Sequence, residues 1–115
     1  MAGEQPGERL AEGIGRLVAQ LTTLRRMSVS VAGMLEAGKL PNNEAALVKD
    51  LGTNWEQALP DRARALAAFL DPATGNRQGL DAELAFATII APKLTIQGGT
   101  REVLRGIIAR GLGLR

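Results

Sequence analysis

Apolar residues recur at steps of three and four along residues 10–35, which is the period of one face of an α-helix. The stripe consists of Leu10, Ile14, Leu17, Leu21, Leu24, Val31 and Leu35, with an interruption at Ser28. It predicts a long helix from about Glu8 to Ala37 that packs this face against another helix. Two glycines, Gly13 and Gly15, would each weaken the helix by roughly 1 kcal/mol relative to alanine unless a neighbouring helix approaches closely there.

A second helical pattern follows the break at Gly38-Lys39-Leu40-Pro41. Either Asn42 or Asn43 is predicted to cap this helix, because asparagine side chains accept hydrogen bonds from the first free N–H groups. Its expected inner face carries Leu47, Val48, Leu51, Trp55 and Leu59. Pro60 is expected to break or kink the run, with a helical continuation over Asp61–Leu70.

The remaining pattern predicts two shorter helices after a turn at Asp71–Asn76. The first, Leu80–Ile90, is apolar enough to be buried and is closed by Pro92. The last runs from about Thr100 to Arg110, with Gly111 or Gly113 as its C-terminal stop. Its expected buried residues are Val103, Leu104, Ile107, Ile108 and Leu112. No repeat and no alternating strand pattern occurs, so we expect an all-α, up-and-down bundle of four to five helices.

Composition narrows the chemistry that this chain can perform. Apolar residues make up 45% of the 115 residues and aromatic residues only 3%, which favours helix-on-helix packing and disfavours an aromatic binding site. Histidine and cysteine are absent, which excludes disulfides, thiol catalysis and zinc sites of the usual type, and we expect no metal. The absence of cysteine also fits a cytoplasmic location.

The net charge of +2 is unevenly distributed. Residues from Lys93 onward carry five basic side chains and one acidic one, a net charge of +4, while the first 92 residues sum to −2. A local basic helix favours a small phosphate-bearing ligand or an acidic neighbour over a nucleic-acid surface. No apolar run reaches the roughly 18 residues that a membrane span requires, so no membrane partner is expected. Residues 1–9 are polar and are predicted to be flexible.

The turn before the last helix combines two glycines with a capping threonine. Gly98 and Gly99 let a backbone approach a ligand closely, and Thr100 can cap the helix. The first N–H groups and the positive end of the helix dipole would then face a phosphate. The alternative is an ordinary connection, in which Thr100 is only a cap, Arg101 is solvated, and Glu102 pairs with Arg105.

The sequence of this terminal segment, TIQGGTREVLRGIIARGLGLR over Thr95–Arg115, resembles the carboxyl terminus of the acyl-CoA dehydrogenases. Two upstream segments, Leu10–Lys39 and Asn43–Gln57, are similar to the preceding helices of that family's helical domain. The resemblance identifies residues 10–115 as a C-terminal helical domain of this kind. It implies a flavoprotein oxidoreductase of fatty acid metabolism, in which FAD and acyl-CoA lie between this domain and two others that these 115 residues do not contain.

The resemblance also implies roles for individual residues. Gly98 and Gly99 would lie beside the acyl-CoA substrate, and Thr100, Arg101 and Glu102 would contact FAD. Many family members carry at the position of Gly98 the glutamate that removes the substrate's α-proton, and glycine cannot be a base. We therefore expect no catalytic residue in this chain.

A second departure from the family pattern lies at Asp71–Gly79, where the Gly-Gly-Tyr-Gly type of loop that contacts flavin phosphates is missing. We accordingly expect that the chain alone neither retains FAD nor oxidises acyl-CoA.

Two functions of different classes remain open. The chain is either a fragment or split subunit of an acyl-CoA dehydrogenase, or a non-catalytic helical interaction or scaffold domain. The first predicts unpaired apolar surface and a homo-oligomer, or a complex with a chain that supplies the missing domains, whereas the second predicts a monomer. Arg105 is expected either to pair with a carboxylate elsewhere in the assembly or to be solvated.

Overall fold

The computed structural model describes residues 6–71, 73 and 75–114. Within them the chain forms α1 (Pro6–Glu36), α2 (Asn42–Ala67), α3 (Arg77–Ile90), the short 3-10 helix η1 (Ala91–Thr95) and α4 (Arg101–Gly111). No strand occurs in this part of the chain. The predicted all-α class and the up-and-down course of the helices are confirmed.

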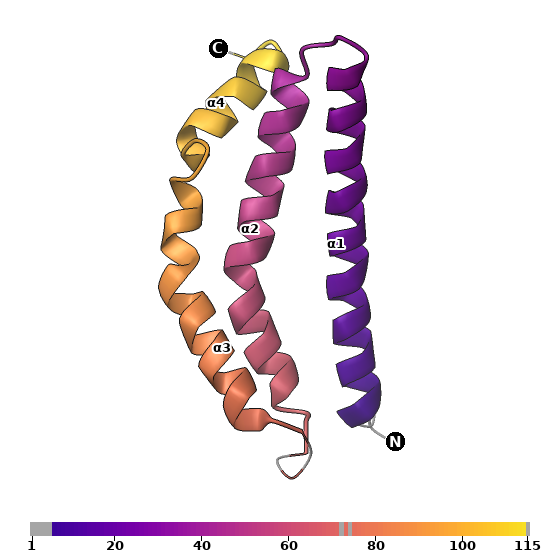
Figure 1. The fold of residues 1–115 in the computed structure, drawn as a ribbon, viewed down its shortest axis with the longest axis vertical. Helices are drawn as coiled ribbons and strands as arrows, with labels where there is room; N and C mark the ends of the chain where they lie inside the picture. The colour runs from indigo at the N-terminus through magenta and orange to yellow at the C-terminus, as the bar shows by residue number, and fades with distance from the viewer. Residues whose placement is uncertain (1–5, 72, 74, 115) are drawn as a thin grey trace.

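The helices form a layer with α2 in the middle (Figure 1). On one side α1 runs antiparallel to α2, and on the other side α3, η1 and α4 follow one another as a bent arm. This arrangement is extended, since the radius of gyration is 18.0 Å where a compact domain of this length would have about 13 Å. Most of each outer helix therefore faces away from the layer.

The face that α1 turns toward α2 differs in part from the predicted stripe. It follows alternating steps of three and four through Leu10, Gly13, Leu17, Gln20, Leu24, Met27, Val31 and Met34. The predicted members Ile14, Leu21 and Leu35 are instead 48%, 51% and 58% exposed. The helix carries two neighbouring apolar stripes, one that faces α2 and one that includes Ile14, Leu21 and Leu35. Apolar periodicity alone could not separate them, so the prediction combined residues of both.

Helix α1 approaches α2 closely at Gly13, one of the two glycines near its start. A Cβ atom at Gly13 would collide with the Leu66 side chain, whereas a Cβ at Gly15 would meet nothing within 4 Å. Of these two glycines, only Gly13 lies where an added side chain would force Leu66 to move. Gly15 serves no such packing role, so its only effect is to lower the stability of the helix relative to alanine.

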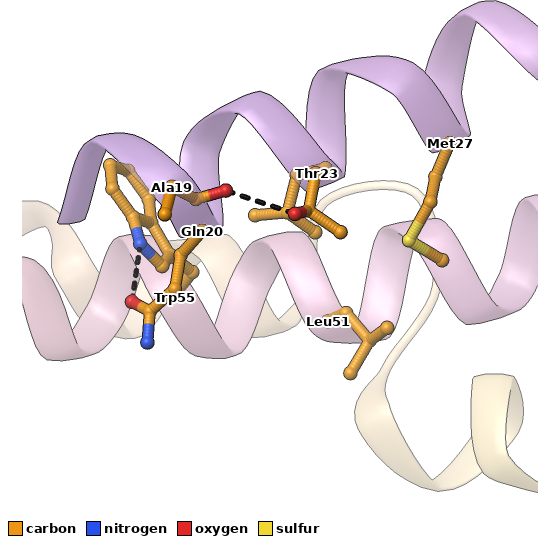
Figure 2. A pocket seen from close by; sticks show the side chains of 7 residues that line it. Ala19, Gln20, Thr23, Met27, Leu51 and Trp55 are labelled. Atoms are coloured by element: carbon orange, nitrogen blue, oxygen red, sulfur yellow. Dashed lines mark hydrogen bonds between the residues drawn. The ribbon is translucent and has the colours of Figure 1, made fainter. Parts of the chain in front are cut away.

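A groove of about 350 Å³ lies along the contact between α1 and α2 (Figure 2). It is lined by Ala19, Gln20, Thr23, Leu24, Met27, Leu51 and Trp55. Trp55 lies on the inner face of α2, as predicted, and its Nε1 donates to Gln20 Oε1 at 3.1 Å. Arg62 Nη1 donates to the same oxygen at 2.8 Å. Gln20 thus fixes the register of the two helices through two hydrogen bonds in an otherwise apolar contact.

The helix ends show which predicted signals were right. Gly38 has φ +75°, and the N–H of Lys39 donates to Met34 O at 2.9 Å, so α1 ends in a glycine cap as expected. The predicted asparagine cap of α2 is wrong, because Pro41 occupies the cap position and no side chain accepts a hydrogen bond there. The helical continuation expected after Pro60 is confirmed, although α2 runs through Pro60 to Ala67 without the break that was one of the two outcomes expected there.

The first and last helices also begin and end differently from the prediction. Helix α1 begins at Pro6, so residues 6–9 are helical, while residues 1–5 of the expected flexible terminus lie outside the described residues. At the other end, Gly113 has φ +78° and ends α4, and Gly111 is still helical. A Cβ at Gly111 would collide with Asn43, so this glycine allows α4 to approach α2.

The described residues contain a small core. Its buried apolar members are Ala46, Ala67, Leu84 and Leu104. The expectation that the third helix is buried is wrong except at Leu84, because Phe86 and Ile89 are exposed. In α4, Val103 and Leu112 are likewise exposed, whereas Leu104 is buried as predicted. Among the described helices only α2 lies along the bent arm, so side chains on the other sides of the arm remain exposed (Figure 1).

A search for membrane spans among the described residues found no helix that is long and apolar enough to cross a bilayer.

Candidate functional site

The predicted glycine turn adopts the backbone that its sequence requires. Gly98 and Gly99 have φ values of +74° and +114°, in the half of φ space that side chains disfavour. Thr100 caps α4 as predicted, because its Oγ1 accepts a hydrogen bond from the N–H of Val103 at 3.3 Å. The N–H groups of Arg101 and Glu102 have no partner among the described residues, so they remain available to an acceptor.

A groove of about 510 Å³ joins this turn to α2. It is lined by Asn42, Ala45, Ala46, Lys49, Gly98, Leu104 and Ile107. Lys49 lies over the turn, since its Cε would be 3.5 Å from a Cβ at Gly98. Its ammonium group forms no ion pair within the described part of the chain. The groove therefore places a cation beside the glycine turn, which suits an anionic ligand.

Lys49 was not predicted from the sequence. No local pattern marks this lysine, because its position beside Gly98 depends on how α4 packs against α2. The small residues Ala45 and Ala46 were the available signal, since side chains of this size let a second helix approach closely.

The face of α2 that contacts α3, η1 and α4 carries a line of polar side chains, which we call the polar seam. It consists of Asp50, Thr53, Gln57 and Arg64. The buried Ala46, Pro60 and Ala67 lie on the same face of the helix. These seven residues follow one another along α2 at alternating steps of four and three, so they share one face of the helix. The regular spacing of the polar residues could have revealed this face from the sequence, but only apolar residues were used to predict buried faces. Asp50 and Thr53 are both buried.

Arg101 points toward this seam. Its Nη2 donates to Gln57 Oε1 at 2.9 Å, and Gln57 Nε2 in turn donates to Ala91 O at 2.9 Å. Arg101 is therefore not simply solvated, which was the alternative considered for it. Its Nε is buried and has no hydrogen-bond partner. These bonds tie the start of α4 to α2 and to η1, so they hold the glycine turn in place.

The two charged residues that follow lie in different environments. Arg105 pairs with Asp50 of the same chain, with Nε and Oδ2 3.5 Å apart, whereas the expected carboxylate partner was one elsewhere in the assembly. The alternative pairing between Glu102 and Arg105 is wrong. Glu102 is exposed and forms no ion pair within the described residues, so its carboxylate is free to contact a ligand or a second domain.

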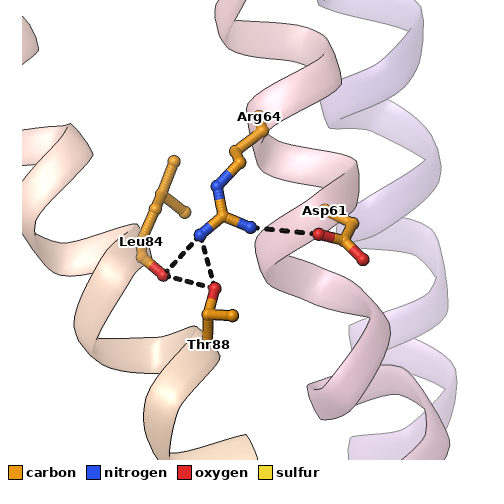
Figure 3. Close-up of polar contacts among 4 residues, drawn as sticks. All are labelled: Asp61, Arg64, Leu84 and Thr88. Carbon is orange, nitrogen blue, oxygen red and sulfur yellow. Dashed lines mark hydrogen bonds and ion pairs between the residues drawn. The ribbon is translucent and has the colours of Figure 1, made fainter.

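The far end of the seam attaches α3 (Figure 3). Arg64 Nη2 donates to Leu84 O at 3.0 Å and to Thr88 Oγ1, while its Nη1 pairs with Asp61 Oδ1 at 3.0 Å. One guanidinium thus connects α2 to two consecutive positions of one face of α3. The bent arm is attached at both ends by arginines, Arg64 near α3 and Arg101 at α4.

Thr53 offers a test of the seam, because its buried Oγ1 has no hydrogen-bond partner. A buried hydroxyl without a partner costs about 1–3 kcal/mol, so Thr53→Val should raise the free energy of unfolding by about 1 kcal/mol. Urea denaturation followed by circular dichroism measures this change.

Thr88→Val is the matched control for this substitution. Its hydroxyl bonds both Leu84 O and Arg64, so the same chemical change should not stabilise the protein. If both variants gained stability equally, the polar seam as described would be contradicted.

The described residues contain no group of histidine, cysteine, aspartate and glutamate side chains that could hold a metal ion.

Comparison with known proteins agrees with the all-helical architecture of the described residues. A family model described as acyl-CoA dehydrogenase, C-terminal domain, matches residues 7–113. The chain therefore belongs to the family of acyl-CoA dehydrogenase C-terminal domains. Searches of curated proteins and of solved structures gave no match.

Proposed function

We propose that this chain serves as the C-terminal domain of an acyl-CoA dehydrogenase, a flavoprotein that oxidises acyl-CoA to 2-enoyl-CoA. In this proposal it acts in the cytoplasm as a fragment or split subunit and contributes one edge of the FAD and acyl-CoA site. The family match over residues 7–113 carries the proposal. The glycine turn, with its free N–H groups and the adjacent Lys49, supports a ligand-facing role for this end of the domain.

The residues at the turn fit part of a flavin nucleotide. The N–H groups at the start of α4, capped by Thr100, suit a phosphate or ribityl oxygen. The exposed Glu102 could accept a hydrogen bond from a ribose or ribityl hydroxyl. Arg101 would act mainly by holding the turn, because its Nη2 is engaged by Gln57. When bound, FAD would supply the electron acceptor for the oxidation.

No aromatic side chain of the described residues lines this groove, so nothing there would stack against a flavin ring. The fit is therefore to one edge of the cofactor. This agrees with the proposal that other domains or chains supply the rest of the site.

The substrate side of the proposal involves Gly98 and Gly99. A backbone without side chains at these positions would let an acyl thioester lie against the turn. The groove beside them contains no carboxylate among its lining residues, so it offers no base for the α-proton. We infer that any catalytic base comes from outside this chain.

The non-catalytic scaffold remains the second candidate, and the observation that favours it is Gly98 at the position of the base. The exposed stripe of α1 and the exposed side chains of α3 favour the first, since a free-standing domain would cover such surface.

A complementation experiment tests the proposed function. The chain is mixed with an acyl-CoA dehydrogenase fragment that lacks its C-terminal domain, FAD is added, and flavin retained after gel filtration is measured by absorbance. We expect more FAD to be retained with the chain than without it. The Glu102→Gln variant should reduce this retention, because it removes a charged acceptor at the proposed cofactor edge.

Glu83→Gln is the matched control, since Glu83 is also exposed but lies on α3. It should leave flavin retention unchanged. Retention that is the same with and without the chain would argue for the scaffold candidate instead.

A further inference from the structure

The groove between α1 and α2 extends in both directions beyond the part that Trp55 lines. That part shares Gln20 with a second hollow of about 350 Å³ and shares Met27 with a third of about 170 Å³. The α1 residues of the three hollows include one row at alternating steps of four and three, which consists of Arg16, Gln20, Thr23, Met27, Ser30 and Met34. The hollows therefore adjoin one another along one side of the contact, and we call them together the long groove.

The middle of the long groove presents apolar surface. Met27 and Leu51 line it together with the Trp55 ring (Figure 2). The only polar atom of that ring, Nε1, is engaged by Gln20 Oε1, and Leu51 is 40% exposed. Covering this surface with hydrocarbon is favourable, because apolar area then leaves water.

The two ends of the long groove carry opposite charges. Arg16 and Arg62 line one end, and Glu44 lines the other. Arg16 is partly neutralised by Glu12, whose Oε1 lies 2.7 Å from its Nη2. Arg62 forms no ion pair within the described residues, and its Nη1 donates to the neutral Gln20. The arginine end therefore has a positive charge that this part of the chain does not compensate, which suits an anionic group.

We propose that the long groove binds an amphiphile with an anionic head group and a linear hydrocarbon tail, such as a free long-chain carboxylate. The head group pairs with Arg62 and Arg16, because a guanidinium matches the two oxygens of a carboxylate. The tail runs past Trp55 toward Met27. The distance from position 16 to position 27 along α1 is about 16 Å, close to the length of an extended dodecanoate. Glu44 at the other end disfavours the reverse orientation, since like charges repel.

The size of the long groove fits a small molecule. Its two larger hollows, of about 350 Å³ each, fall within the range of roughly 300–1,000 Å³ that is typical of ligand sites. Such sites are mostly apolar and contain a few polar groups that fix the orientation of the ligand. In the long groove these groups are the two arginines at one end.

The long groove is separate from the groove at the glycine turn. Helix α1 lies on one side of α2, whereas α3, η1 and α4 lie on the other side (Figure 1). Lys49 and Gly98 line the groove at the turn and not the long groove. The inference therefore does not rest on the proposed function, and flavin retention and amphiphile binding are measured independently.

A fluorescence titration of the full chain with dodecanoate, below its micelle concentration, tests the proposal. Trp55 is the single tryptophan of the sequence, so its emission reports from the long groove itself. We expect a saturable change in emission. Octanoate should bind more weakly because its tail buries less apolar area. The uncharged dodecanol should bind about tenfold more weakly than dodecanoate, because it lacks the charge-assisted pairing.

Charge-removing variants test the position of the head group. Arg62→Gln should raise the Kd of dodecanoate about tenfold, while circular dichroism confirms that the helices are retained. Arg16→Gln should have a smaller effect in the same direction, because Glu12 already neutralises part of its charge. The control is Arg25→Gln, which removes the same charge from an exposed position of α1 outside the groove and should leave the Kd unchanged.

Four results would overturn the proposal. A titration without a saturable change in emission would mean that protein, such as a partner helix, covers the groove. Equal binding of dodecanol and dodecanoate, or equal weakening by Arg25→Gln and Arg62→Gln, would mean that the arginine end does not recognise the head group. Weaker binding to a Lys49→Gln variant would place the amphiphile at the glycine turn.

Discussion

The Leu104→Ala variant should lose about 3 kcal/mol of unfolding free energy. Leu104 is 6% exposed and is the buried residue of α4, where it packs against α2. Replacing a buried leucine by alanine typically costs about 2–5 kcal/mol, because the apolar contact is lost and a cavity remains. Since few large side chains are buried in this layer, this loss should be a large share of the total stability. Urea denaturation monitored by circular dichroism measures it.

Val103→Ala provides the control for this prediction. Val103 precedes Leu104 on the same helix but is 55% exposed, so its truncation should cost well under about 1 kcal/mol. Equal losses for the two variants would mean that α4 does not pack against α2 in the manner described.

The second large effect concerns two glycines of the same segment that should respond to alanine with opposite signs. Gly99 has φ +114°, and a Cβ there would lie 3.3 Å from Leu104 Cδ2. The backbone strain alone should cost about 1–2 kcal/mol. Gly106 lies within α4, where a Cβ would meet nothing within 4 Å. Gly106→Ala should instead stabilise the protein by about 1 kcal/mol, since alanine is the better helix former.

Thermal unfolding of the two variants under identical conditions compares these effects directly. We expect the melting temperature to fall for Gly99→Ala and to rise for Gly106→Ala. If Gly99→Ala also became more stable, the turn would not require a positive φ, and the case for a specialised ligand-facing backbone would fail.

Helix positions were predicted well because their signals are local. The apolar period of α1, the glycine stop at Gly38 and the cap at Thr100 all depend on residues within one or two turns of each other. The prediction was less exact at Pro60, where a break or a kink was expected and α2 continues as one helix to Ala67. It failed where burial depends on the number of neighbouring helices, as at Phe86 and Ile89.

The candidate site was predicted in part for the same reason. The turn at Gly98 and Gly99 and its capping threonine could be recognised from consecutive residues. The contributions of Lys49 and Gln57 could not, because both come from α2 and reach the turn through tertiary packing. The polar seam was missed because its residues follow a helical period that apolar patterning does not detect.

The most direct test of the central claim is a visible spectrum of the purified chain after incubation with FAD and gel filtration. The claim is that this chain supplies one edge of a flavin site and cannot hold the cofactor alone. We expect the protein fraction to lack the flavin absorbance, with all FAD eluting later as the free nucleotide. Flavin that elutes with the protein, and whose absorbance is bleached by an acyl-CoA, would show that the chain contains a complete site and would contradict the account.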